Sequence, residues 1–458
     1  MAERIVALRY EDLPAAAIEW GTIAMLDTVG VTLAGSVETA PRVVEEIPEA
    51  GSGPSLIFGS RRRAGCLDAA LINGTAAHAL DFDNATNTMF GHASATMIPA
   101  LLAAGEAYGG TGRDVLVAHA VGFETGARLG RGLNMHHYEK GWHPTSTLGV
   151  FSVTAACAHL LKLSVPQTAT ALALCTSLAA GIKANFGTMT KPLHVGNCAR
   201  SGLMAALLAR KGFTANSDAF EHTQGFFNVF NGPGNYDASR VLAGWGEPFD
   251  IVSPGACYKQ YPCCASTHAA VDATLSLVRT HGPFDAKAIA RVDSWTSAQR
   301  LAHTDRPVPM SALDAKFSVQ YCVARALLHG NVRIEHLEGD AYLDPLVRSL
   351  LPRIHAAPYT AVQFPTGNPV AAEVKITLAD GKTFSAKVDR PLGRTSHNPI
   401  APESMQAKFV NCASRVLAPH AVVAAAETIG KFEMLESMRD FTVLLETDRV
   451  QVDAEVQT

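Results

Sequence analysis

Apolar residues recur at helical spacing along most of this chain. Between residues 15 and 34 they mark one face of a helix, and Gly35 follows as a stop. The same spacing, with abundant Ala and Leu, predicts further helices over residues 67–80, 97–108, 115–129, 148–161, 167–180, 199–211 and 268–280. Gly122, Gly126 and Gly149 fall inside these runs, and we expect them to mark close approaches between helices.

The pattern changes near Pro254. Residues 290–299, 372–378 and 383–388 alternate between apolar and polar, which predicts strands, and Asp380-Gly381 predicts a hairpin turn between the last two. From residue 402 to 450 the helical spacing returns. The predicted fold is therefore mainly α. We expect a large all-helical domain formed by both chain ends, 1–255 and 400–458, with a smaller α+β domain, 256–399, inserted between them.

Composition fits a globular protein. Of 458 residues, 48% are hydrophobic and 17% are charged, and the net charge is −4. The chain lacks a basic tract, so we expect no nucleic-acid partner. It also lacks an uncharged apolar run of about 18–20 residues and a basic-then-apolar start, so we expect no membrane association and a cytoplasmic location. The low charge fraction favours a homo-oligomer that buries apolar surface.

The nine cysteines include no CxxC pair, which argues against a zinc site, an iron–sulfur cluster or a disulfide scaffold. Nucleotide-binding glycine motifs and the GxSxG turn of serine hydrolases do not occur either. We therefore expect neither a cysteine-ligated metal site nor a nucleotide cofactor.

One candidate site is the segment from Gly187 to Gly196, which carries Lys191. Its glycines and Pro192 predict an extended segment rather than a regular helix. An ammonium group fixed there would suit a small anionic substrate. A surface loop with an ordinary lysine is the equally weighted alternative.

A second candidate site is the cluster of His78, Asp81, Asp83 and His92. His78 and Asp81 are three residues apart and share a face if the helix continues. Two carboxylates and two imidazoles could move protons or bind a metal, although the spacing fits no standard metal site. A helix end followed by a polar loop is the simpler alternative.

Four further residues carry polar groups in apolar surroundings. His143 precedes Pro144 and a Thr/Ser cluster typical of a helix start, where the helix dipole favours a neutral imidazole. Lys259 and His268 flank an X-Pro turn. Tyr321 could donate a proton, but the pattern favours it as the first buried ring of a helix.

Taken together, these segments resemble the MmgE/PrpD family, which includes 2-methylcitrate dehydratase, cis-aconitate decarboxylase and iminodisuccinate epimerase. The resemblance extends from about residue 5 to residue 440. The motifs that carry it are His78-Ala-Leu-Asp81-Phe-Asp83, Gly141-Trp-His143-Pro-Thr-Ser, Thr190-Lys191-Pro-Leu-His194 and Ser266-Thr-His268. It implies a helical domain with an inserted α+β lid, a homodimer, and a small carboxylate substrate handled without a metal or organic cofactor.

The resemblance also implies roles for individual residues. Lys191 and Lys259 would hold substrate carboxylates, with His268 and His78 close by in the binding pocket. His92 or His143 would be the general acid or base, and Asp81 would orient an imidazole. Tyr321 would donate a proton or contact a carboxylate.

One departure from the family pattern concerns Asn84-Ala85, where relatives often have an acid followed by Thr or Ser. This removes one charge and one hydroxyl. We expect a lyase or isomerase that removes a proton next to a carboxylate, with dehydration of a 2-methylcitrate-like substrate favoured. Epimerisation of an iminodisuccinate-like substrate and cis-aconitate decarboxylation are alternatives. A catalytically silent anion-binding protein and a metal hydrolase using the His78–His92 cluster are alternatives of other classes.

Overall fold

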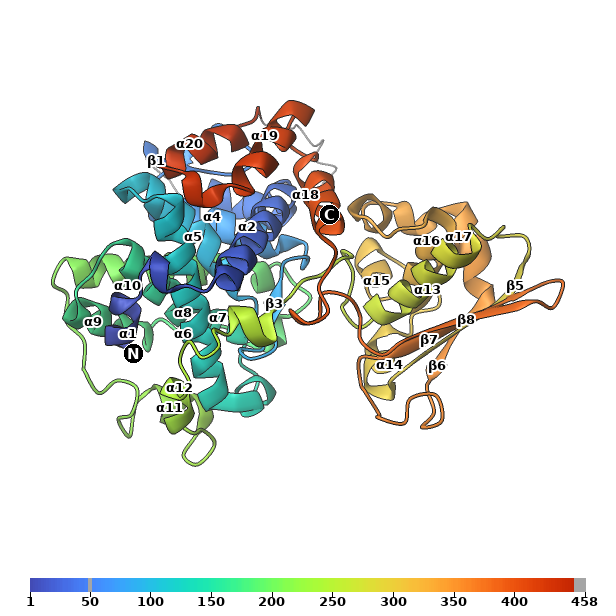
Figure 1. The fold of residues 1–458 in the computed structure, drawn as a ribbon, viewed down its shortest axis with the longest axis horizontal. Coiled ribbons are helices and arrows are strands. Elements are labelled where there is room, and N and C mark those ends of the chain that lie inside the picture. The colour runs from blue at the N-terminus through green and yellow to red at the C-terminus, as the bar shows by residue number, and fades with distance from the viewer. Residues whose placement is uncertain (48–51, 449–458) are drawn as a thin grey trace. The chain divides into compact units, whose positions relative to one another are not determined.

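The computed structural model describes residues 1–47 and 52–448, and it is mainly α-helical, as the sequence pattern predicts. The chain divides into two compact units (Figure 1). The helical unit comprises Met1–Tyr258 and Ala401–Thr458, and the α+β unit comprises Lys259–Ile400.

The helical unit has a core of long helices. These are α2 (Ala15–Gly35), α4 (Cys66–Ala79), α5 (Ala93–Tyr108), α6 (Gly112–Glu139), α8 (Gly149–Leu160), α9 (Val165–Cys175) and α10 (Thr190–Arg210). Shorter helices lie around them: α1 (Ala2–Ala7), α3 (Thr39–Glu46), α7 (Pro144–Thr147), α11 (Phe226–Asn231) and α12 (Ser239–Leu242). Two small antiparallel pairs complete it, β1 (Ser52–Leu56) with β2 (Arg63–Ala64) and β3 (Ala85–Thr86) with β4 (Ala256–Cys257).

The C-terminal segment packs onto the N-terminal helices. It forms α18 (Pro402–Ala413), α19 (Pro419–Ile429) and α20 (Met438–Thr442). Helices α18 and α19 contact α2, and α20 contacts α5 (Figure 1). Two ends of the sequence therefore share one hydrophobic core.

Helices α4 and α10 cross at a pair of glycines. A Cβ atom at Gly74 would lie 2.8 Å from the Cα atom of Gly196, and one at Gly196 would lie 2.2 Å from the carbonyl oxygen of Leu71. This contact brings the end of α4, which carries His78, beside the start of α10, which carries Lys191.

The predicted close approaches at the other helical glycines also occur. A Cβ atom at Gly122 in α6 would lie 2.5 Å from the carbonyl oxygen of Ser152 in α8, and one at Gly149 would lie 3.2 Å from the sulfur of Cys198 in α10. At Gly126 the nearest atom would be the Ser152 hydroxyl, at 2.1 Å. Helix α8 therefore packs at van der Waals contact against both α6 and α10.

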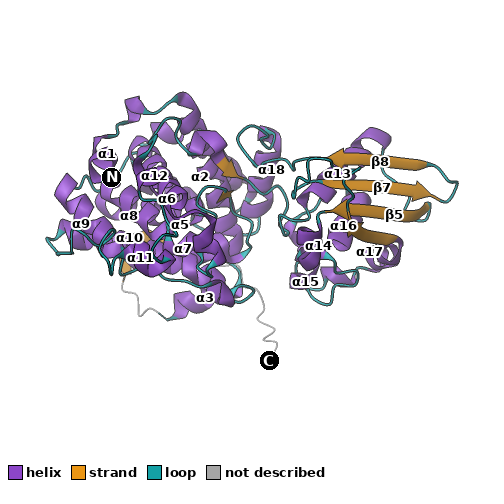
Figure 2. Ribbon diagram, turned by 90° about the horizontal axis from the view of Figure 1, so that it is seen from below, coloured by secondary structure: helices purple, strands orange, loops and turns teal. Residues whose placement is uncertain are grey.

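The α+β unit is a four-stranded sheet with helices on one face. The strands are β5 (Ile289–Thr296), β6 (Ile354–Pro358), β7 (Ala372–Leu378) and β8 (Thr383–Val388), in the order β6-β5-β7-β8. The β5–β6 pair is parallel and the others are antiparallel. The helices are α13 (His268–His281), α14 (Ala298–Thr304), α15 (Ala312–Lys316), α16 (Val319–His329) and α17 (Pro345–Leu350). Helices α13 and α16 cover the sheet and share its core (Figure 2).

The prediction of an extended segment around Lys191 is wrong. Helix α10 begins at Thr190, so Lys191 and Pro192 lie in its first turn. A proline is tolerated there because the first backbone N–H groups of a helix have no partner within the helix. Gly196 lies inside this helix. A glycine is required at that position because α4 leaves no room for a side chain.

Among the described residues, no single helix combines the length and hydropathy of a membrane span. One bent pair, Ala15–Gly35 with Thr39–Glu46, meets that test by length and composition alone, with an angle of 76° between its helices.

We predict that Gly196→Ala lowers the free energy of unfolding by roughly 1–3 kcal/mol, because its methyl group would meet backbone atoms of α4 that cannot move aside alone. Chemical denaturation of both variants measures this. Gly430→Ala is the matched control. Its Cβ atom would lie 3.4 Å from the nearest atom, in a helical backbone conformation, so its stability should stay within about 0.5 kcal/mol of wild type. Equal stability of the two variants would contradict the tight α4–α10 crossing.

Candidate active site

The carboxylate of Asp83 lies between two imidazoles. Its Oδ1 atom is 2.8 Å from Nδ1 of His78, and its Oδ2 atom is 2.8 Å from Nδ1 of His92. Helix α4 ends at Ala79, and Asp81 adopts a left-handed backbone conformation with φ of 51°. The turn that follows the helix points Asp83 back toward His78.

Burial and charge fix the protonation of this group. The Asp83 and His78 side chains are fully buried. Burial alone would raise the pKa of Asp83, but the two imidazoles and the hydrogen bond from His78 hold it well below its usual range. Burial lowers the pKa of His78 to about 4, against the opposing attraction of Asp83. A carboxylate can only accept, so neutral His78 donates its Nδ1–H to Asp83, and its Nε2 atom carries the lone pair.

Asp81 pairs with Lys191 rather than with an imidazole. Its Oδ1 atom is 3.0 Å from Nζ of Lys191 and 4.0 Å from Nε2 of His92. The Lys191 ammonium also lies 5.3 Å from the ring centre of Phe186. Asp83 rather than Asp81 lies in close contact with both imidazoles, and the orienting role predicted for Asp81 stays a prediction. Asp83 makes these contacts because the helix ends before residue 81, so His78 and Asp81 do not share a helical face.

His143 forms the opposite side of the cluster. It precedes Pro144, the first residue of α7, as the sequence predicts. Its Nδ1 atom is 3.1 Å from Nδ1 of His194, and its ring lies 4.8 Å from Phe186 and 6.1 Å from His78, centre to centre. Burial is the main cause of its strongly lowered pKa, and the nearby Lys191 charge adds to it. The ring is therefore neutral, as expected, although burial rather than the helix dipole is the principal cause.

A buried ion pair anchors the loop that carries Asp81 and Asp83. Nζ of Lys408, in α18, lies 2.6 Å from Oδ1 of Asp27, in α2, and donates at 2.8 Å to the carbonyl oxygen of Phe82. The same ammonium lies 3.8 Å from the centre of the Phe82 ring. Lys408 thus fixes the residue between the two site carboxylates.

Asn84 completes this anchor. Its backbone N–H and its side-chain amide both donate at 3.0 Å to Oδ2 of Asp27. The departure from the family pattern therefore lies in the scaffold, because the Asn84 amide donates to a carboxylate that a second acid would repel. Ala85 pairs with Cys257 in the β3–β4 ladder.

Comparison with known proteins agrees with this geometry. The model of the MmgE/PrpD N-terminal domain matches residues 1–239, and that of the MmgE/PrpD C-terminal domain matches residues 261–432. The chain belongs to the MmgE/PrpD family. The family's two domain models together span most of the sequence, including every candidate site residue except Lys259.

Curated relatives within this family are cis-aconitate decarboxylases. The human enzyme (Homo sapiens) is 30% identical over 386 residues, covering 82% of this chain and 79% of the relative. The mouse enzyme (Mus musculus) is 30% identical over 405 residues, with 84% and 80% covered. That of Aspergillus terreus (strain NIH 2624 / FGSC A1156) is 26% identical over 464 residues, with 96% and 93% covered. The MmgE/PrpD family and these relatives together indicate a lyase.

Three residues that the MmgE/PrpD resemblance assigns to the pocket belong to the α+β unit. Lys259 and His268 are buried, and Nε2 of His268 lies 3.2 Å from the carbonyl oxygen of Cys263. The cluster in the helical unit is built without them. Their contact with substrate stays a prediction.

Tyr321 is the exception among the predicted residues. It is fully buried in α16, and its hydroxyl contacts the carbonyl oxygens of His336 and Ala341 at 2.7 and 3.0 Å and accepts a hydrogen bond from Arg325 at 2.9 Å. These contacts give the hydroxyl a structural role, and the predicted catalytic role of Tyr321 stays a prediction. The alternative of a buried ring at the start of a helix is confirmed.

Asp83 and His194 join the site, although the family resemblance gave neither of them a role. Both lie inside the motifs that carry the resemblance to the MmgE/PrpD family, and that signal could have included them. Among the described residues, His78, Asp81, Asp83 and His92 form a group that could hold a metal ion. The predicted absence of a metal and of a cofactor remains a prediction.

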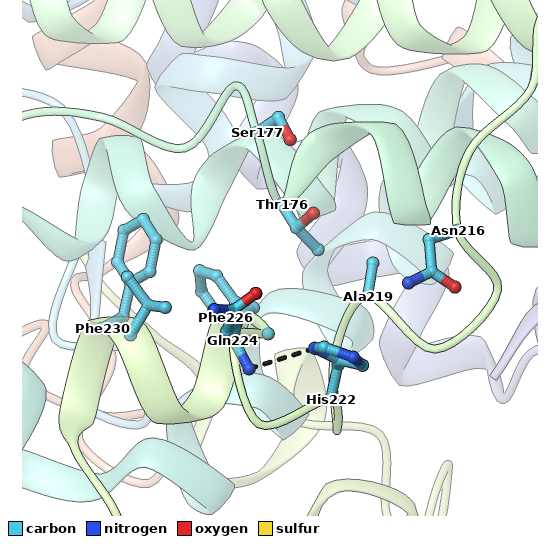
Figure 3. A pocket seen from close by; sticks show the side chains of 10 residues that line it. Thr176, Ser177, Asn216, Ala219, His222, Gln224, Phe226 and Phe230 are labelled. Carbon is cyan, nitrogen blue, oxygen red and sulfur yellow. Dashed lines mark hydrogen bonds between the residues drawn. The ribbon is translucent and has the colours of Figure 1, made fainter.

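A separate pocket of about 230 Å³ lies beside α11 (Figure 3). His222 accepts a hydrogen bond from the backbone N–H of Gln224 on one wall, and Phe226 and Phe230 form another. The carbonyl oxygen of Phe230 accepts a hydrogen bond from the Trp142 indole at 2.9 Å. One wall of this pocket therefore adjoins the turn that leads into His143.

We predict that Lys408→Met costs about 3–5 kcal/mol of stability, because it leaves the buried carboxylate of Asp27 without its cation. The double variant Asp27→Leu/Lys408→Met should recover part of that loss, since it removes both buried charges. Turnover should stay low in both, because neither holds the Phe82 carbonyl and Asn84 in place. Denaturation and steady-state rates, measured on the same preparations, test this. Full turnover in the double variant would contradict the anchoring role.

Proposed function

We propose that this chain is a carboxy-lyase that acts on a small tricarboxylate of the cis-aconitate type, without a metal or organic cofactor. The observation that carries this proposal is the cluster in which Lys191 lies 3.0 Å from Asp81, beside neutral His143 and the His92–Asp83 contact. The relatives of similar length support the same reaction class. Dehydration of a 2-methylcitrate-like substrate, favoured by the sequence, has less support from these relatives.

The proposed reaction breaks the bond between one carboxylate carbon and its neighbour. Carbon dioxide leaves, and the electron pair stays on the remaining carbon skeleton, conjugated with a second carboxylate. Lys191 would bind that carboxylate and stabilise its developing negative charge. Substrate would compete with Asp81 for the ammonium, so Asp81 holds the lysine in position until substrate arrives.

A proton must then add to carbon. His92 is the proposed donor, because its ring contacts the Asp83 carboxylate at 2.8 Å and is partly exposed, so that a bound substrate can reach it. Buried His143 has no carboxylate in contact with its ring among the contacts described, and Lys191 raises the cost of charging it. We assign neutral His143 to hydrogen-bond a substrate carboxylate. This division between two imidazoles follows from their different surroundings.

The remaining predictions belong to this proposal. The α+β unit would act as a lid that supplies Lys259 and His268, and the protein would be a cytoplasmic homodimer. Neither feature is needed for the chemistry assigned to Lys191, His92 and His143.

Proton NMR in D₂O with purified protein and a substrate panel tests the proposed function. The panel contains cis-aconitate, citrate, 2-methylcitrate and iminodisuccinate-type dicarboxylates. We expect a decarboxylated product from cis-aconitate that carries one deuterium on carbon. Water loss from 2-methylcitrate, or exchange without bond cleavage, would replace the proposal with a dehydratase or an epimerase. No change in any member would favour a silent anion-binding protein.

We predict that His92→Gln and His143→Gln each lower turnover by roughly 10²–10⁴-fold, because one removes the proton donor and the other removes a hydrogen bond to a substrate carboxylate. Lys191→Met should mainly raise KM, because it removes the cation that binds a substrate carboxylate. His222→Ala, an exposed histidine in the separate pocket, is the matched control and should keep wild-type turnover. Equal rates for wild type and both histidine variants would contradict the assignment.

A further inference from the structure

Four ligand-type side chains converge in the helical unit. His78, Asp81, Asp83 and His92 each place one nitrogen or oxygen atom within 4.8 Å of those of the others. Ligand atoms that bind one Zn²⁺ ion tetrahedrally at 2.0–2.2 Å lie about 3.3 Å apart. The largest separation within the group, 4.8 Å, exceeds this value by only about 1.5 Å. Small side-chain shifts would therefore place all four around one ion.

A second observation points to a ligand. Nε2 of His78, Nδ1 of His92 and Oδ2 of Asp83 are buried atoms without a hydrogen-bond partner. The last two are only 2.8 Å apart, yet their geometry does not make a hydrogen bond. Buried polar atoms are nearly always satisfied by protein, water or an ion. Two ligand atoms in contact without a shared hydrogen bond fit neighbours on a metal ion.

We propose that these four residues bind a divalent transition metal, with Zn²⁺ as the best match, and that the bound ion inhibits the enzyme. Two imidazole nitrogens and two carboxylate oxygens are ligands that zinc accepts. Two carboxylates against the single ammonium of Lys191 leave the group with a net negative charge, which attracts a cation. Inhibition rests on the proposed function, because the ion would occupy His92 and Asp83, whereas binding does not depend on it.

The effect of the Lys191 charge on zinc affinity provides a direct test of this proposal. Its ammonium holds Asp81 at 3.0 Å and would repel an incoming cation. Removal of the lysine should therefore remove this repulsion and tighten zinc binding. The same change should weaken binding of a carboxylate substrate. A site of any other composition would not respond to Lys191 in this way.

Isothermal titration of the full chain with Zn²⁺ measures binding without any turnover. We expect one zinc site per chain that is weakened at least about 10-fold in His92→Ala and in Asp83→Asn, and tightened in Lys191→Met. His222→Ala should bind zinc as wild type does. His92→Ala is the safer variant, because His92 is partly exposed while Asp83 is fully buried.

Titration with Co²⁺ separates this site from the cysteines. All nine cysteines are free thiols, and thiolate ligands would add a sulfur-to-metal charge-transfer band that imidazole and carboxylate ligands lack. We expect d–d absorption without that band. In activity assays, Zn²⁺ should inhibit reversibly, and a chelator should restore the rate. Identical isotherms for wild type and His92→Ala, or weaker binding in Lys191→Met, would overturn the zinc site. Tight binding without inhibition would overturn only its inhibitory role.

Discussion

The buried pair of Lys408 and Asp27 joins two distant parts of the chain at the one loop on which the site depends. The ammonium neutralises Asp27 and binds the carbonyl oxygen of Phe82, while Asp27 accepts both donors of Asn84. A buried ion pair of this kind contributes little net stability compared with apolar packing, but breaking it is costly. Its value here is geometric, because it fixes the residues on either side of Phe82. The C-terminal segment thereby supports the site through Lys408, which is not one of the residues assigned to bind substrate.

With that loop fixed, the carboxylate of Asp83 gives the histidines of the site different surroundings. Asp83 is anionic, sets the tautomer of His78 and contacts His92, whereas His143 is buried against Phe186 and His194. Similar side chains therefore acquire different proton affinities from their surroundings alone. The same carboxylate explains why the cluster resembles a metal site. Ligands arranged to position protons are also arranged to surround a cation, and the ammonium of Lys191 opposes one.

The two glycines at the α4–α10 crossing connect the fold to this chemistry. Without side chains at Gly74 and Gly196 the helix axes approach closely, and His78 at the end of one helix lies near Lys191 at the start of the other. The relatives named as cis-aconitate decarboxylases are similar over most of their length, which fits a lyase whose site depends on the whole helical unit. Dehydration, decarboxylation and epimerisation all begin with charge that develops next to a carboxylate. The site geometry serves that shared requirement, and the identity of the leaving group depends on how the substrate lies.

The sequence by itself determined the helical character of most of the chain, the strands near residues 372–388, and the grouping of His78, Lys191 and His143 in polar segments. These features are local, because helical spacing, turn residues and sequence motifs each involve residues within about twenty positions of one another. It misplaced Lys191 in an extended segment, because Pro192 and nearby glycines suit a first helical turn packed against another helix as well as they suit a loop. Tertiary structure alone decided that Asp83 contacts both His78 and His92, that the Tyr321 hydroxyl is hydrogen-bonded in the core, and that Lys408 supports the site. These outcomes depend on where helix α4 ends and on contacts between residues more than three hundred positions apart in the sequence. No local sequence pattern encodes such contacts.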